Sequence, residues 1–141
     1  MNVELGDKVY DTLKLYLQNK SSYSPYVLKR ALKESDKFPL VTLEEIDNVQ
    51  TGGTTKTRIR ELTSKIEFEI NIYAIDKSSG SKIIAAPEIS NELKALVDKV
   101  MTNYFQFTRT VCKPTPNLDD TIYRVTMRYE VGILESKNIL Y

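Results

Sequence analysis

Two stretches of the chain repeat apolar residues with the spacing of an amphipathic helix. The first runs from Val3 to Gln18, and its stripe is formed by Val9, Leu13, Tyr16 and Leu17. The second runs from Ala86 to Tyr104 and has Pro87 near its start, where the missing N–H of proline is harmless. Its expected apolar face comprises Ile89, Leu93, Leu96, Val97, Val100, Met101 and Tyr104. Both stripes are typical of helices that pack on a core.

Other stretches alternate apolar and polar residues, which is the pattern of a half-buried strand. The segment Ser64 to Ile75 alternates most clearly, with Ile66, Phe68, Ile70 and Ile72 on one face. The segment Thr121 to Leu134 places Tyr123, Val125, Met127, Tyr129 and Val131 on one face. A further strand is expected from Phe107 to Lys113, and an imperfect one from Leu40 to Ile46. The segment Tyr26 to Leu32 fits either a strand or a helical turn.

The connections are rich in turn-forming residues. A flexible loop is expected at about residues 48–60, because Thr51-Gly52-Gly53-Thr54-Thr55 offers little material for a core. A polar turn is expected from Asp76 to Lys82, and a hairpin-like connection at residues 114–120. The last residues, at about 135–141, read as a short tail. The glycine pair lacks the spacing of a phosphate-binding loop, so no nucleotide site is expected.

These elements predict one α+β domain spanning residues 1–141. Strands with one apolar and one polar face favour a mostly antiparallel sheet. Two amphipathic helices packed on the apolar face would complete a two-layer structure. The length fits one domain better than two.

Composition narrows the chemistry. The chain has 20 basic and 19 acidic residues and no histidine. The near-neutral balance argues against a dedicated nucleic-acid binder. Without histidine, imidazole acid–base catalysis and most zinc sites are excluded. The single cysteine, Cys112, cannot form an internal disulfide and is expected to be a small packed residue.

An enzymatic role is therefore not expected, and neither a cofactor nor a metal is. Glu67 and Glu69 could converge at a spacing of about 7 Å along a strand, but a catalytic carboxylate site needs a cleft and further partners. The N-terminus shows no secretory signal and no apolar run is long enough to cross a bilayer, so a cytoplasmic protein without membrane contact is expected.

The polar side of the predicted sheet is the main functional clue. It would carry Glu67, Glu69, Asn71, Arg124, Thr126, Arg128 and Glu130. One interpretation is a solvated face with weak cross-strand ion pairs. The other is a surface that meets a second subunit or lines a channel.

Several segments in the second half share a pattern with one protein family. They are Lys65 to Ala74, Ala86 to Leu93 with Val97 to Met101, Phe107 to Thr110, Pro114 to Asn117, and Thr121 to Tyr129. In these segments, which cover about half the chain, and in the order of its elements, the sequence resembles the tail terminator (tail-completion) proteins of tailed bacteriophages. The resemblance rests on pattern and on no diagnostic motif.

The resemblance implies a structural subunit of a homo-oligomeric ring, usually a hexamer, that caps the tail tube, stops its polymerisation and offers a docking surface for the neck. The implied partners are further copies of the chain, the tail tube protein and a neck or head-completion protein, with passive contact to DNA in the lumen. The implied location is the host cytoplasm and then the tail–neck junction of the virion. The expected interface residues are Thr51, Gly52, Gly53, Thr54, Thr55, Lys56, Arg58, Glu67, Glu69, Arg124, Arg128 and Glu130.

Three alternatives stay open from the sequence. One is a head-completion or neck adaptor subunit. Another is a small enzyme that uses carboxylates or an oxygen-ligand metal. The last is a nucleic-acid-binding module that uses the basic residues Lys56, Arg58, Arg60, Arg124 and Arg128.

Overall fold

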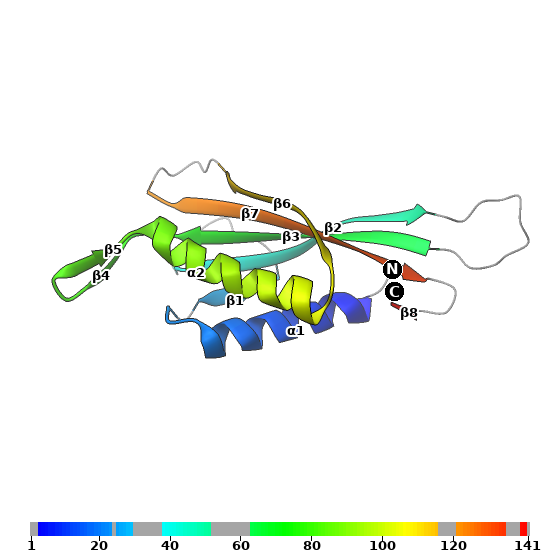
Figure 1. Ribbon diagram of the computed structural model, residues 1–141, viewed down its shortest axis with the longest axis horizontal. Helices are drawn as coiled ribbons and strands as arrows, with labels where there is room; N and C mark the ends of the chain where they lie inside the picture. Colours follow the sequence, from blue (N-terminus) through cyan, green and yellow to red (C-terminus); the bar gives the residue numbers. More distant parts are fainter. Residues whose placement is uncertain are drawn as a thin grey trace, which may run out of the picture.

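The computed structural model describes residues 3–23, 25–29, 38–51, 63–115, 121–134 and 139–140. Within them, α1 (Val3–Lys20) and α2 (Ala86–Asp98) lie on one face of a sheet (Figure 1). The sheet has the strand order β1-β2-β3-β7-β6, with β8 beside β7. Its members are β1 (Tyr26–Leu28), β2 (Leu40–Thr51), β3 (Thr63–Ala74), β6 (Thr108–Thr115), β7 (Tyr123–Leu134) and β8 (Ile139–Leu140).

All described strand pairs are antiparallel except that of β1 with β2. The expected α+β architecture, with a mostly antiparallel sheet and two helices on one face, is confirmed. The core lies between the two layers, where Val9, Leu13 and Leu17 of α1 are fully buried together with Leu93 and Val97 of α2. The apolar stripes of the two helices therefore pack on the apolar face of the sheet to form one core.

The central strands β3 and β7 pair over twelve residues in an unbroken register. Phe68 lies opposite Tyr129, and Ile70 lies opposite Met127. All four of these side chains are at most 1% exposed. The alternating pattern of the sequence thus places one apolar set of each strand on the helix side: Ile66, Phe68, Ile70 and Ile72 of β3, and Val125, Met127, Tyr129 and Val131 of β7.

Polar contacts fix the helices onto the sheet. The Asp76 carboxylate accepts the backbone N–H of Ala86 at 2.8 Å, at the first turn of α2. This bond satisfies a donor that the helix itself leaves free. Ser21, which follows α1, donates its hydroxyl to Glu92 of α2 at 2.7 Å and so joins the two helices. The Tyr10 hydroxyl of α1 donates to the carbonyl of Val27 in β1 at 3.0 Å.

The second strand is longer than its sequence pattern predicts. It continues past Ile46 to Thr51, so residues 48–51 are strand and not loop, and the expectation of a loop there is wrong. A bulge between Glu45 and Asp47 interrupts the alternation. The bulge explains why the strand pattern was lost after Ile46, because one extra residue shifts a period-two pattern, while the loop itself was expected from the glycines and small polar residues that follow.

The second helix changes character at its end. A π-helical turn, η1 (Lys99–Tyr104), follows α2, and the N–H of Phe105 bonds to the carbonyl of Val100 at 3.0 Å. A π-turn holds more residues than an α-turn, so the end of the turn is displaced from the α-helical stripe, although Val100 and Met101 stay buried. Tyr104 was expected on the apolar face, but it is 63% exposed, and that expectation is wrong.

Two short elements replace expected irregular structure. Residues 76–82, expected as a polar turn, contribute to a separate hairpin of β4 (Lys77–Ser79) and β5 (Lys82–Ile84). Gly80 allows its tight turn because it adopts a positive φ of 64°. The expected C-terminal tail includes β8, whose Ile139 and Leu140 pair with Leu134 and Ile133 of β7. The short segment that began at Tyr26 is a strand, which decides between the two alternatives for it.

Candidate functional site

The face of the sheet that points away from the helices, here called the open face, collects the polar residues of the central strands. Register places Glu69 opposite Arg128 and Asn71 opposite Thr126. It also places Tyr73 opposite Arg124, whose guanidinium lies 5.6 Å from the centre of the Tyr73 ring. The residues that alternation assigned to one face are thus neighbours in space.

A continuous hydrogen-bond chain crosses three strands on this face. Thr115 of β6 donates its hydroxyl to Thr126 of β7 at 2.6 Å. Thr126 donates to the side-chain oxygen of Asn71 at 2.7 Å, and Asn71 donates its amide to Glu69 at 3.1 Å. Arg128 closes the chain by donating Nε to Glu69 at 3.0 Å. Together with Arg124, these residues are called the open-face network.

Asn71 is the centre of the open-face network, where its side-chain oxygen accepts hydrogen bonds and its side-chain nitrogen donates one. Its Oδ1 accepts from Nε of Arg124 at 3.0 Å as well as from Thr126. Arginine can only donate and an ionised carboxylate can only accept, so the amide orientation is fixed by its partners. Asn71 and Thr126 are each 5% exposed. A buried polar group with all its partners in place is held rigidly.

Charge on the open face is paired unevenly. Arg128 approaches Glu69 through Nη2 as well as Nε, with the ion-pair distance at 3.0 Å. The Glu69 side chain is 14% exposed and that of Arg128 is 43% exposed. Lys65 pairs with Glu130 at 3.1 Å, while Glu67 lies directly opposite Glu130 in the register. The face therefore presents fixed arginines next to a locally acidic end.

The predicted interface residues divide into two groups. The structure brings Glu67, Glu69, Arg124, Arg128 and Glu130 onto the open face together. Thr51 is the last residue of β2, paired with Thr63. The remaining predicted residues, Gly52, Gly53, Thr54, Thr55, Lys56 and Arg58, lie outside the described residues.

Some members of the face had no sequence signal that named them as interface residues. Thr115 joins the network from β6, so the expectation that the hairpin-like connection begins at residue 114 is wrong for Pro114 and Thr115, while residues 116–120 lie outside the described residues. Tyr73 stacks with Arg124, although the sequence pattern assigned it to neither face. Thr42 and Glu44 of β2 lie opposite Asn71 and Glu69, respectively. Pairing register, which a single sequence does not give, decides all of these placements.

The geometry of the carboxylates argues against catalysis at Glu69. Both of its oxygens accept hydrogen bonds, from Arg128 and from Asn71. A carboxylate whose two oxygens are both engaged by protein donors is a poor candidate for a general base. Among the described residues, no group of three or more acidic or cysteine side chains is arranged to hold a metal ion.

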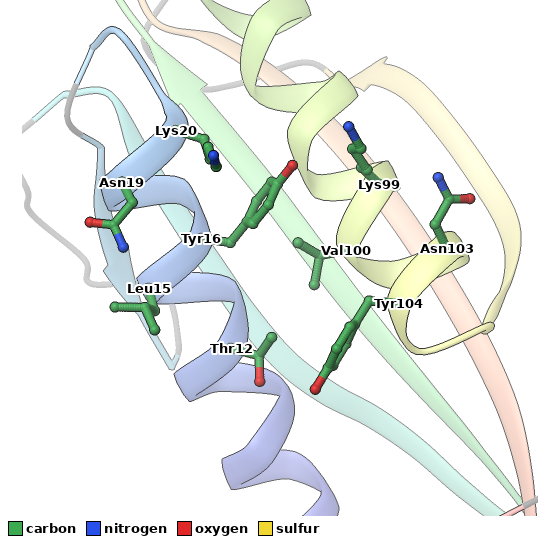
Figure 2. Close-up of a pocket in the computed structure, with 9 residues that line it drawn as sticks. All are labelled: Thr12, Leu15, Tyr16, Asn19, Lys20, Lys99, Val100, Asn103 and Tyr104. Atoms are coloured by element: carbon green, nitrogen blue, oxygen red, sulfur yellow. The ribbon is translucent and has the colours of Figure 1, made fainter.

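A second surface feature lies on the helix layer, between α1 and η1. It is a groove of about 580 Å³ whose apolar residues include Tyr16 and Val100 (Figure 2). Tyr104 reaches into the space between the two helices from the π-turn. Lys20 lies on the α1 wall and Lys99 on the other. The sequence did not indicate this groove, because Tyr104 lines it only through the π-helical rotation.

No family model matches this chain, and no curated protein matches it. In the part of the chain that the structure describes, no helix has the length and apolar character needed to span a membrane.

Proposed function

We propose that this protein is a structural assembly subunit that uses the open face of its sheet as a protein interface, in the role of a ring-forming tail terminator. The observation that carries the proposal is the open-face network. Six residues from three strands form this network, and its two arginines are held in fixed positions on a face that the helices leave uncovered.

The rigidity of this face favours binding over simple solvation. An ordinary solvated face carries long side chains that are free to move, and ordering each of them on binding costs about 0.5–1.5 kcal/mol. Arg124 and Arg128 are already ordered by Asn71 and Glu69. Arg128 keeps 43% of its side chain exposed, so its outer donors can meet a carboxylate of another subunit.

The tail-terminator role follows from the resemblance described above. A ring subunit needs a surface that repeats from copy to copy and closes after a fixed number of rotations. A face of mixed charge supports such contacts and, with a net charge of +1 for the whole chain, does not favour tight sequence-independent DNA binding. The alternative head-completion role would use the same face toward the portal side.

The deciding experiment measures tail length by negative-stain electron microscopy in particles assembled without this gene. Overlong or variable tails with unattached heads are expected for a tail terminator. Tails of normal length beside leaky or tailless heads would instead assign the protein to the head side of the neck. Intact, infectious particles would contradict both assembly roles.

A point variant tests the interface itself. Arg124→Glu/Arg128→Glu reverses both fixed charges and is expected to abolish head–tail joining. Lys8→Glu/Lys82→Glu, on α1 and the β4–β5 hairpin, reverses two charges away from the open face and is the matched control. Melting temperatures of the purified chains separate loss of an interface from loss of folding. Normal joining by a folded double variant would exclude the open face as the interface.

A further inference from the structure

The groove between α1 and η1 combines an apolar floor with two cations on opposite walls. Tyr16 and Val100 lie in the floor, and Tyr104 reaches across it (Figure 2). No described side chain forms an ion pair with Lys20 or with Lys99. Exposed tyrosine next to apolar residues is typical of binding surfaces, because its ring gives contact area while its hydroxyl stays hydrated.

The groove also offers hydrogen-bonding groups that fit a backbone. Asn19 and Asn103 line it from α1 and η1, respectively. A side-chain amide both donates and accepts, so it can pair with an N–H and a C=O of an extended chain. An occupant that presents free backbone groups, an apolar side chain and negative charge on both sides would therefore match the groove.

The outer edge of β2 has these properties. β1 pairs with β2 only as far as Thr42, so no described strand covers the edge from Leu43 onward. At the bulge, Ile46 is 36% exposed. Glu44 faces the open side of the sheet and Glu45 the helix side, because their cross-strand partners are Glu69 and Phe68. The edge thus carries one carboxylate on each side of an exposed apolar residue.

Glu45 is partly buried, and this burial raises its pKa above the usual value for glutamate, while the positive charge of the N-terminal amine acts in the opposite direction. No described side chain forms an ion pair with it. A lysine brought to this carboxylate would offset the desolvation.

We infer that the groove between α1 and η1 receives the β2 edge around Glu44–Ile46 of a second copy of this chain. Ile46 enters between Tyr16 and Tyr104, and the two carboxylates meet Lys20 and Lys99. The contact joins two different surfaces, so it is heterologous and repeats head to tail until a ring closes. It rests on the proposed ring-forming function and adds a contact between these two surfaces to the one proposed for the open face.

Reciprocal charge reversal tests the contact in the purified full-length chain. Sedimentation equilibrium of the wild type is expected to show concentration-dependent self-association. Lys20→Glu/Lys99→Glu and Glu44→Lys/Glu45→Lys are each expected to weaken it by about tenfold or more. An equimolar mixture of the two variants places opposite charges together again at one interface and is expected to restore hetero-association.

Two controls keep the test interpretable. Lys8→Glu/Lys82→Glu makes the same change of net charge outside the groove and is expected to leave association unchanged. Ile46→Ser removes the apolar anchor without changing charge, and it is expected to weaken association while circular dichroism stays that of the wild type. It serves in place of the glutamate variant if that variant does not fold.

Three results would overturn the inference. They are a wild-type chain that stays monomeric up to roughly 1 mM, folded groove variants that associate like the wild type, and a mixture that shows no recovery. None of these results decides the proposed function. Overlong tails without the gene, combined with any of them, would keep the tail-terminator role and place the ring contact elsewhere.

Discussion

Tyr129 and Asp98 lie in different layers of the molecule and are joined by a hydrogen bond of 2.8 Å from the phenol to the carboxylate. Tyr129 is fully buried in the sheet, while Asp98 is the last residue of α2 and also pairs with Arg109 at 3.2 Å. Burial, followed by the bond to Asp98, raises the pKa of Tyr129 far above its usual value. The phenol therefore stays a donor at any physiological pH.

Removing this donor should lower stability. Tyr129→Phe keeps the ring but leaves Asp98 without its buried partner, and a hydrogen bond to a charged group is worth about 1.5–3 kcal/mol. Urea unfolding is expected to show a loss of that size. Tyr104→Phe, a change at an exposed ring, serves as the control, and equal stability of the two variants would contradict the role given to Tyr129.

Replacing Asn71 should make the stability of the protein depend on pH. Asn71→Asp keeps the oxygen that accepts from Arg124 and Thr126, but it turns the atom that donates to Glu69 into a second acceptor. Two facing carboxylates raise the pKa of at least one of the pair. Stability should therefore be lowest at neutral pH and recover as the pH falls and one proton bridges the pair. Denaturant midpoints at several pH values measure this effect, and a pH-independent loss would refute it.

Removing one hydroxyl should stabilise the protein. Ser90 of α2 is 0% exposed, and its Oγ has no hydrogen-bond partner. Ser90→Ala removes an unsatisfied buried polar group and replaces serine with a better helix former. We expect a gain of about 1 kcal/mol in the free energy of unfolding. Asn91→Ala, at the exposed neighbouring position, controls for helix propensity, and a gain confined to that control would contradict the explanation.

Neutralising Glu45 should change how stability responds to pH. The folded state raises the pKa of this carboxyl, so between the unfolded and folded pKa values the native chain binds more protons than the unfolded chain. This contribution to stability is present at low pH and is lost as pH rises through that window. Glu45→Gln removes the loss, and its advantage over the wild type should grow from acid to neutral pH. Glu44→Gln is the matched control, and an advantage that shrinks toward neutral pH would reverse the sign argued here.

The sequence predicted those parts of the fold that depend on periodicity. The stripes of α1 and α2 and the alternation of β3 and β7 identify buried faces directly, because helices and strands have different side-chain periods. The same alternation placed Glu69, Arg124 and Arg128 on one polar face. It could not show that Glu69 pairs with Arg128, since register depends on the partner strand.

Features that depend on local irregularity or tertiary contact were not predictable. The bulge after Glu45 breaks alternation and hid the second half of β2. The π-turn displaced Tyr104 from its expected face, and no residue pattern in Lys99–Tyr104 marks it. The groove needs both this rotation and the approach of α1, so neither helix reveals it alone.

The bulge in β2 also has a consequence for how this strand tolerates changes in length. Ile46 is the one residue between Leu40 and Thr51 without a partner in β3, while eleven residue pairs align on its two sides. Ile46 is therefore a single extra residue in a strand whose pairing with β3 is otherwise regular. Excising Ile46 would leave all eleven pairs in frame, whereas excising one residue from a regular part of the strand would turn every later side chain to the opposite face. A deletion of Ile46 thus removes the exposed apolar side chain of the β2 edge while the strand keeps its pairing with β3.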